Sequence, residues 1–214
     1  MNKQLTPEQA VSKIKNGITL MVGGFLANRS ALKILELLCH SDVKDLTLIV
    51  NDSGFPDSAY GKLLANGQVS RLITSHMGTN PAAIDLMNAG KLEVEFVPQG
   101  TLAERIRAAG AGLGGILTPT GLGTLVEKGK EKITIDGKEF LLEKPLHADI
   151  SLIGASIGDK SGNLIYKGTS QNMNPLMATA ADLVIAEVGE LVETGSIAPE
   201  QVHTPGIFVD FIVD

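Results

Sequence analysis

Short apolar runs alternate with segments of helical periodicity over most of this chain, and that alternation restricts the fold more than any other feature. The runs expected to form strands are residues 18–22, 46–51, 71–75, 92–98, 150–155 and 183–187. The segments expected to form helices are residues 7–15, 31–39, 58–65, 81–89, 102–109 and 175–181. Strands and helices in this order form parallel sheets with right-handed crossovers. The sequence therefore predicts an α/β fold, with an open, mainly parallel sheet and helices on both faces.

The middle of the chain departs from this pattern. Residues 110–123 are rich in glycine and carry Pro119 between two threonines, which predicts a structured loop. Residues 132–142 then alternate apolar and polar side chains around Asp136-Gly137, a strong signal for a β-hairpin. The sequence thus predicts a small β-hairpin excursion from the main sheet. A length of 214 residues suits one domain over residues 1–214, which ends on the strand-like apolar run 207–213.

The charge of the chain argues against polyanionic partners. Eighteen Lys and Arg stand against 24 Asp and Glu, a net charge of −6, so no cationic surface for nucleic acid or an anionic membrane is expected. The longest apolar stretch, residues 18–27, is well below the roughly 20 residues that span a bilayer. Residues 1–8 contain no apolar leader segment, and the single Cys39 cannot form an internal disulfide, so we expect a cytoplasmic protein with Cys39 as a small buried hydrophobe.

Three common types of site find little support in the residue spacing. The four histidines show no i, i+4 pairing and one cysteine cannot form a thiolate cluster, so no metal site is expected. Residues 110–115 fit the dinucleotide pattern G-x-G-x-x-G, but a predicted helix precedes them where that site needs a strand. Residues 154–158 fit G-x-S-x-G, but the turn-forming residues 159–163 follow where a serine hydrolase needs a helix.

Two connections from strand to helix support a different site. Gly23 and Gly24 follow the first predicted strand, and Gln99 and Gly100 follow the fourth. Ligands of open α/β sheets bind at the carboxyl ends of the strands. Glycines there let backbone N–H groups approach an anionic or thioester ligand. A plain tight turn at Gly23-Gly24 is the alternative interpretation.

These segments belong to a longer series of motifs that resembles the α subunit of family I CoA-transferases. In chain order the series is Met21-Val22-Gly23-Gly24-Phe25, Asn51-Asp52, residues 97–107, residues 110–124, Gly162-Asn163-Leu164, Asn172-Met173-Asn174-Pro175, Glu193-Thr194-Gly195 and Thr204-Pro205-Gly206. The resemblance covers essentially the whole chain, and the block from Gln99 to Thr124 is its most specific part. It is greatest to bacterial enzymes of the acetate/acetoacetate and butyrate/acetoacetate types.

This resemblance implies a ping-pong transfer of CoA between short-chain carboxylic acids of the acetate, acetoacetate and butyrate class. Coenzyme A would be a substrate, with no permanently bound cofactor and no metal. In the family, the glutamate that attacks the acyl-CoA lies on a β subunit. The resemblance therefore implies a β-subunit partner, most simply in an α2β2 assembly, and neither a nucleic acid nor a membrane partner.

The resemblance also implies roles for particular residues. Gln99 would support the oxyanion with its side-chain amide, and Asn51 and Gly100 would lie at the substrate site. The segment that contacts coenzyme A would be Gly23, Gly24, Phe25, Leu26, Ala27, Asn28 and Arg29.

That segment departs from the family pattern at two positions. Arg29 stands where the family has a glycine, and Ala31 where it has a proline. A glycine that needs positive φ is poorly replaced by arginine, so either the turn is rebuilt, or Arg29 adds a cation beside the carboxylate or phosphates of the ligand. A second class of function therefore stays open, a non-catalytic binding or scaffold protein on the same fold.

Overall fold

A seven-stranded sheet forms the centre of the protein, in a computed structural model that describes residues 3–214. The strand order is β13-β11-β8-β1-β2-β3-β4, and every neighbouring pair is parallel. Its strands are β1 (Thr19–Val22), β2 (Leu46–Ile49), β3 (Val69–Thr74), β4 (Glu93–Phe96), β8 (Ala148–Ala155), β11 (Ala181–Val188) and β13 (Phe211–Val213). The predicted open, parallel sheet is confirmed, because all six predicted runs take part in it.

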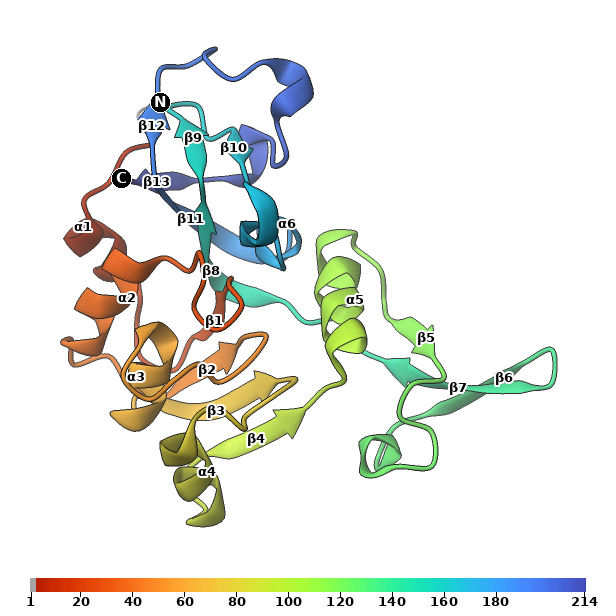
Figure 1. Cartoon of the computed structure of the whole chain (residues 1–214). Helices are drawn as coiled ribbons and strands as arrows, with labels where there is room; N and C mark the ends of the chain where they lie inside the picture. Colours follow the sequence, from red (N-terminus) through yellow and green to blue (C-terminus); the bar gives the residue numbers. More distant parts are fainter. Residues whose placement is uncertain (1–2) are drawn as a thin grey trace.

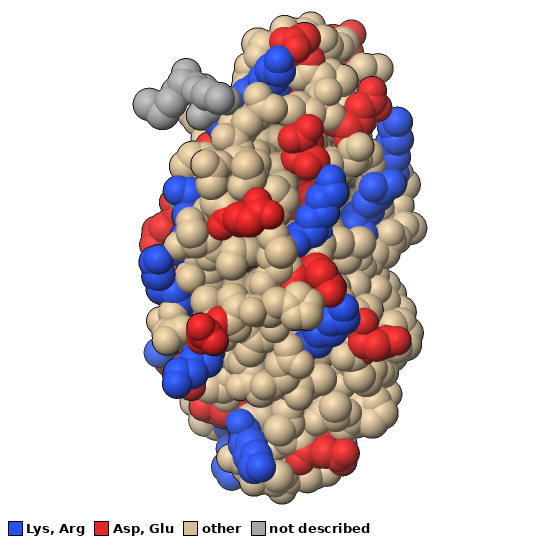
Figure 2. All heavy atoms as spheres, turned by 90° about the vertical axis from the view of Figure 1, so that its left-hand side faces the viewer, with Lys and Arg blue, Asp and Glu red and all other residues tan. Residues whose placement is uncertain are grey.

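Helices cover both faces of this sheet, as predicted (Figure 1). One face carries α1 (Pro7–Val11), α2 (Leu32–Cys39), α3 (Ala59–Ala65) and α4 (Pro81–Asn88), and the other carries α5 (Gln99–Gly110) and α6 (Asn174–Met177). Each layer of helices packs on its own cluster of buried apolar side chains. Lys, Arg, Asp and Glu are interspersed on the face viewed in Figure 2, without a patch of one sign.

Three helices have bounds that differ from the prediction by more than one residue. Helix α1 begins as expected, with Thr6 and Gln9 in a capping box, but it ends at Val11 because the N–H of Ile14 bonds to Val11 O in a tight turn. Helix α5 begins three residues early, at Gln99, since Leu102 N already bonds to Pro98 O. The low helix propensity of Gly100 and Thr101 hid this first turn. Helix α6 is short because Ala181 already belongs to β11.

The predicted hairpin forms and projects from the body of the protein (Figure 1). Strands β6 (Lys132–Ile135) and β7 (Lys138–Glu143) pair around Asp136-Gly137, whose φ angles of +49° and +74° fit a tight hairpin turn. The glycine-rich loop contributes an unpredicted strand, β5 (Ile116–Thr118), to this sheet, followed by a 3-10 turn, η1 (Leu125–Glu127). Arg105 on α5 joins the hairpin to the body, because its guanidinium donates to Lys144 O and to Glu95 Oε1.

A third small sheet, in the order β10-β9-β12, rules out the hydrolase geometry. It consists of β9 (Ile157–Asp159), β10 (Leu164–Ile165) and β12 (Leu191–Val192). Ser156 is thus followed by strand β9 and then a turn, where a serine hydrolase needs a helix. The Nδ1 of His203 accepts a hydrogen bond from Tyr166 N. Likewise, residues 110–115 begin at the last residue of α5 and lead into strand β5, so they form no dinucleotide fingerprint.

The C-terminal part is less regular than predicted. It contains the 3-10 turns η2 (Gly168–Ser170), η3 (Pro199–Gln201) and η4 (Gly206–Phe208). The apolar run 207–213 is therefore a strand only over β13, because Pro205 and Gly206 direct its first residues into a turn.

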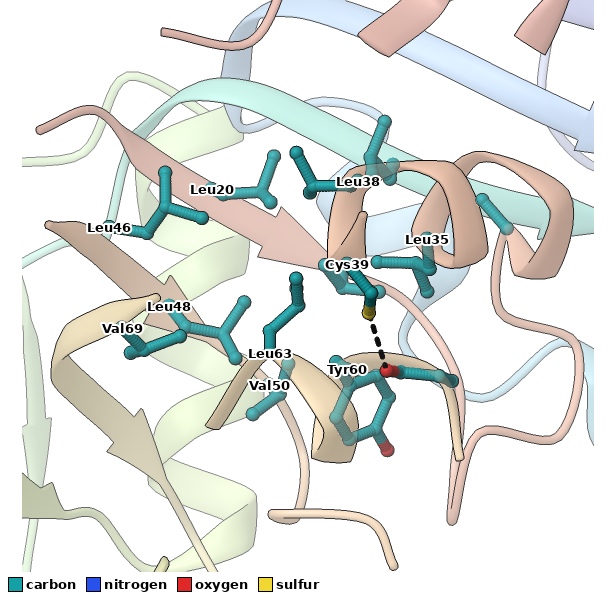
Figure 3. Close-up of a cluster of buried hydrophobic side chains, with 14 of the residues drawn as sticks. Leu20, Leu35, Leu38, Cys39, Leu46, Leu48, Val50, Tyr60, Leu63 and Val69 are labelled. Atoms are coloured by element: carbon teal, nitrogen blue, oxygen red, sulfur yellow. Dashed lines mark hydrogen bonds between the residues drawn. The ribbon is translucent and has the colours of Figure 1, made fainter. Parts of the chain in front are cut away.

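The main core lies between the sheet and helices α1 to α4 (Figure 3). Cys39 is buried in it, as predicted, with its thiol against Ala59 O. Burial raises the pKa of Cys39 to about 11, so the thiol stays protonated and unreactive at neutral pH. Tyr60 lies at the edge of the same cluster, and its hydroxyl points away from the leucine side chains. Among residues 3–214, no helix is both long enough and apolar enough to cross a membrane.

Candidate functional site

The residues predicted to bind ligand gather at the carboxyl edge of the parallel sheet. The segment 23–30, here called the glycine loop, follows β1, Asn51 follows β2, and Gln99 follows β4. In an all-parallel sheet these three connections leave from the same edge, where ligands of open α/β folds bind. The structure thus brings together segments that the sequence places up to 76 positions apart, from Gly23 to Gln99.

Gln99 and Asn51 contact each other directly. The Nε2 of Gln99 donates a hydrogen bond of 2.8 Å to the Oδ1 of Asn51. Asn51 is buried, whereas Gln99 is exposed as the first residue of α5. Gly100 follows in the same helical turn and lines a cavity of about 530 Å³, opposite Ile116 and Leu117 on β5. Gln99 and Gly100 therefore lie at the N-terminal end of α5, and Asn51 contacts that end through Gln99.

The glycine loop has a strained backbone. Leu26, Ala27 and Arg29 all have positive φ angles, of +49°, +62° and +55°. Such left-handed conformations cost an L-residue roughly 1–2 kcal/mol each. Arg29 therefore has the left-handed backbone conformation that suits a glycine.

Buried Asp52 anchors one side of this loop. Its Oδ2 accepts hydrogen bonds from Leu26 N and from the Nδ2 of Asn51, each at 2.9 Å. Its Oδ1 accepts from Gly54 N and from the hydroxyl of Tyr60, also at 2.9 Å. Both carboxylate oxygens are thus occupied by fixed donors, and Asp52 is not available as a nucleophile.

Two asparagines anchor the opposite side of the loop. The Oδ1 of Asn172 accepts from Gly24 N at 3.2 Å, and the Nδ2 of Asn174 donates to Arg29 O at 3.4 Å. The loop approaches so closely that a Cβ on Gly23 would lie 1.8 Å from Asn174 Oδ1. A close approach thus requires glycine at position 23, which gives the predicted Gly23 a structural reason.

Arg29 borders a second cavity, of about 420 Å³, beside the start of α2. Glu187 lies on its wall and accepts hydrogen bonds from Lys33 N and Ile34 N, in place of a side-chain cap on α2. Burial raises the pKa of Glu187 despite those bonds. Arg29 is exposed and forms no ion pair with any residue from 3 to 214, so its charge is free for a ligand.

The predicted site residues lie near one another, but they do not include all the residues that hold the glycine loop. Gly23 to Arg29, Asn51 and Gln99 lie together at the sheet edge, and Gly100 lies in the first turn of α5. Tyr60, Asn172 and Asn174 were not among the predicted site residues, because their bonds to the loop span 33, 148 and 145 positions and leave no local pattern.

The site can orient and stabilise a ligand but offers no evident nucleophile. It supplies the side-chain amide of Gln99, the Arg29 cation and the apolar ring of Phe25, which is 49% exposed. Within the described part of the chain, no group of three His, Cys, Asp or Glu residues could hold a metal ion. Chemistry on a thioester would need its attacking group from elsewhere.

Comparisons with known proteins agree with this arrangement. A family model described as "Coenzyme A transferase" matches residues 4–214. The chain is 49% identical over 211 residues to acetate CoA-transferase subunit alpha of Escherichia coli (strain K12), covering 99% of this chain and 96% of the relative. It is 50% identical over 206 residues to the acetoacetyl-CoA:acetate/butyrate CoA transferase alpha subunit of Clostridium acetobutylicum, covering 96% and 94%.

Solved structures show the same fold. An acyl-CoA transferase from E. coli O157:H7, in a thioester complex with CoA, matches with a TM-score of 0.87 and 25% identity. The match covers 99% of this chain and 47% of the other, so the chain spans about half of that enzyme. Glutaconate coenzyme A-transferase from Acidaminococcus fermentans matches with a TM-score of 0.87 at 21% identity, covering 99% and 75%.

Proposed function

The chain belongs to the coenzyme A transferase family, and from that premise we propose that it is the α subunit of an enzyme that moves CoA between short-chain carboxylic acids. Acids of the acetate, acetoacetate and butyrate class are the proposed substrates, because the names of the similar α subunits contain them. Coenzyme A is then a substrate, with no permanently bound cofactor. We place the enzyme in the cytoplasm, in keeping with its single free cysteine.

One observation carries the mechanistic part of the proposal: the site has several hydrogen-bond donors but no free nucleophile. Asp52 is the carboxylate at its centre, and fixed donors occupy both of its oxygens. The attacking glutamate would therefore come from a β subunit, as the family resemblance implies. With a glutamyl-CoA thioester as the intermediate, the exchange proceeds in two steps. CoA passes from the acyl-CoA to the glutamate, and then from the glutamate to the acceptor acid.

Gln99 would act on the thioester carbonyl. A primary amide has two N–H donors, and the bond to Asn51 uses one of them. The other is available to the oxygen that becomes negative when the carbonyl is attacked. Asn51 is itself held by Asp52, so the Gln99 amide is oriented before the substrate arrives. Such preorganised donors stabilise an oxyanion more than mobile ones do.

The glycine loop would bind the CoA ester beside this amide. Its Arg29 adds a positive charge that the described residues leave unpaired. The carboxylate of the acid and the phosphates of CoA are the anions that this charge would attract. Because the loop keeps its left-handed conformation at Arg29, the departure from the family pattern does not by itself favour the non-catalytic scaffold.

A partner would complete the site. Phe25 in the glycine loop and Leu113, Leu117 and Leu125, in or beside β5 and η1, are exposed apolar side chains. Burial of such side chains against a β subunit would also exclude water from a reactive thioester. The simplest assembly is α2β2.

The proposal is tested by assaying this chain with its β subunit. The two are co-expressed, purified together and supplied with acetyl-CoA, acetoacetyl-CoA or butyryl-CoA and each acceptor acid in turn. CoA exchange by the pair supports the proposal. Stable co-purification without any exchange would instead support the scaffold alternative.

A further inference from the structure

Tyr60 connects the hydrophobic core to the glycine loop. It is the second residue of α3 and is fully buried, with its ring at the edge of the main core cluster (Figure 3). Its hydroxyl points out of that cluster and donates a 2.9 Å hydrogen bond to Asp52 Oδ1. The hydroxyl oxygen of Tyr60 in turn accepts a 3.1 Å hydrogen bond from Ala27 N. The hydroxyl thus links a rigid helix to the middle of the loop.

Two successive loop N–H groups are bound in this way. Leu26 N donates to Asp52 Oδ2 and Ala27 N to the Tyr60 hydroxyl, and these are the two adjacent residues with left-handed backbones. A strained backbone persists only where its surroundings hold it. Without the hydroxyl, the N–H of the buried Ala27 would lose its partner, and the loop would relax to satisfy it.

The carboxylate of Asp52 also connects the glycine loop to the side-chain amide of Gln99. Asp52 Oδ2 accepts from the Nδ2 of Asn51, and Asn51 Oδ1 accepts from the Nε2 of Gln99. A continuous path of hydrogen bonds therefore runs from Ala27 through Tyr60, Asp52 and Asn51 to Gln99. Both walls of the proposed thioester site depend on one buried pair, Asp52 and Tyr60.

We infer that Tyr60 is a positioning residue for CoA transfer, whose hydroxyl holds the glycine loop and the Gln99 amide in register with each other. The inference rests on the proposed function, because it assigns the reaction to this site. Tyr60 itself contacts the loop backbone and Asp52. Its removal should slow the chemical step rather than weaken substrate binding, since misplacement by about 1 Å costs up to roughly 100-fold in rate.

The chain offers a matched control. It contains two tyrosines, and the second, Tyr166, is 3% exposed with its hydroxyl 2.8 Å from Thr204 Oγ1. Tyr60→Phe and Tyr166→Phe each delete one buried, hydrogen-bonded hydroxyl. Tyr60→Phe should lower unfolding stability more, because its hydroxyl has two partners and one of them is a carboxylate. Only Tyr60→Phe should alter the site.

The experiment measures single-turnover formation of the glutamyl-CoA thioester from acyl-CoA on the purified αβ enzyme, together with steady-state KM and hydrogen exchange of residues 23–30. We expect Tyr60→Phe to lower the rate constant of thioester formation about tenfold, with little change in KM, and to speed amide exchange in the loop. Tyr166→Phe should do neither. A parental rate of thioester formation in Tyr60→Phe, or an equal loss of that rate in both variants, would overturn the inference.

A second substitution in the glycine loop tests whether the loss of the Tyr60 hydroxyl acts by misplacing the loop or by damaging the protein in general. Glycine adopts positive φ without strain, so Ala27→Gly should make the loop depend less on its tether. The double variant Tyr60→Phe/Ala27→Gly should recover part of the rate of thioester formation, and no recovery would contradict the role of strain. Hydrogen exchange of the glycine loop does not depend on transferase activity, so it can be measured whether or not the enzyme is active. If the parental enzyme has no transferase activity, the proposed function fails, whereas unchanged loop exchange in Tyr60→Phe refutes the tether.

Discussion

The side chain of Gln99 donates a 2.8 Å hydrogen bond to the Oδ1 of Asn51, across 48 positions of sequence and two strands of the sheet. This bond fixes the direction of an amide that stands at the exposed start of a helix. A residue that only began the helix would not need a buried partner at the carboxyl end of β2. The pair is thus suited to present one N–H to a ligand.

Loss of this amide should reduce catalysis much more than stability. We expect Gln99→Ala to lower kcat of the αβ enzyme about 10²-fold, the lower range for loss of an oxyanion donor. Gln201→Ala, on the exposed turn η3, is the control and should keep the parental kcat. If Gln99→Ala retained the parental kcat, Gln99 would be merely a helix-start residue.

Two substitutions of Arg29 separate the effect of its charge from the effect of its backbone conformation. Arg29→Ala and Arg29→Gly both remove the cation, so both should raise KM for the acyl-CoA or the acid about 5- to 10-fold if it contributes about 1 kcal/mol of binding. Glycine should also relieve strain at φ +55°, so Arg29→Gly should melt at or above the temperature of Arg29→Ala.

The choice of substrate shows which anion Arg29 binds. If the variants raise KM for the acyl-CoA but not for the 3′-dephospho-CoA ester, Arg29 binds the 3′-phosphate. If they raise KM only for the acid, Arg29 binds the carboxylate. Unchanged KM values in both variants would remove the ligand role.

The ion pairs of Glu95 should make the joint between body and hairpin sensitive to acid. Burial acts to raise the pKa of Glu95, but its bonds to Arg105 and Arg71 outweigh burial and lower the pKa below its ordinary value of 4.5. The stabilisation is therefore complete above that value and is lost as the pH falls through the lower, folded-state pKa.

Glu95→Gln tests this directly. At neutral pH it should cost about 1–3 kcal/mol in the free energy of unfolding, the usual effect of losing hydrogen bonds to charged groups. The difference from the parent should shrink as the pH falls below 4.5 in denaturant titrations. Glu93→Gln, on the same strand but much more exposed, should change stability little. A constant deficit at every pH would contradict the ionic explanation.

Local patterns were enough to predict the framework. Strands such as β8 and β11 are buried on both faces, so their continuous apolar runs were recognisable, and Asp136-Gly137 marked the hairpin turn. Strand β5 was missed because its three residues have a partner only in β7, far along the chain. The end of α1 was missed because the helix stops in a turn that no glycine or proline marks.

The site was predicted less completely than the fold. Gly23 and Gln99 have a sequence signal, since they lie between a strand and a helix and within the family motifs. Tyr60 has none, because its hydroxyl acts on a backbone N–H 33 positions away, and its ring is indistinguishable from any core aromatic. The positive φ of Arg29 was suggested only by the glycine of the family pattern at that position, since arginine itself gives no sign of that conformation.

The central claim is that this chain provides half of an active site and its partner provides the nucleophile. The most direct measurement incubates the chain alone, and then the αβ pair, with acyl-CoA, traps the thioester with borohydride or hydroxylamine, and locates the modified residue by mass spectrometry. We predict a single modified glutamate on the β subunit and no modification of the isolated chain. A thioester-derived label on any glutamate of this chain, or turnover without the partner, would contradict the account.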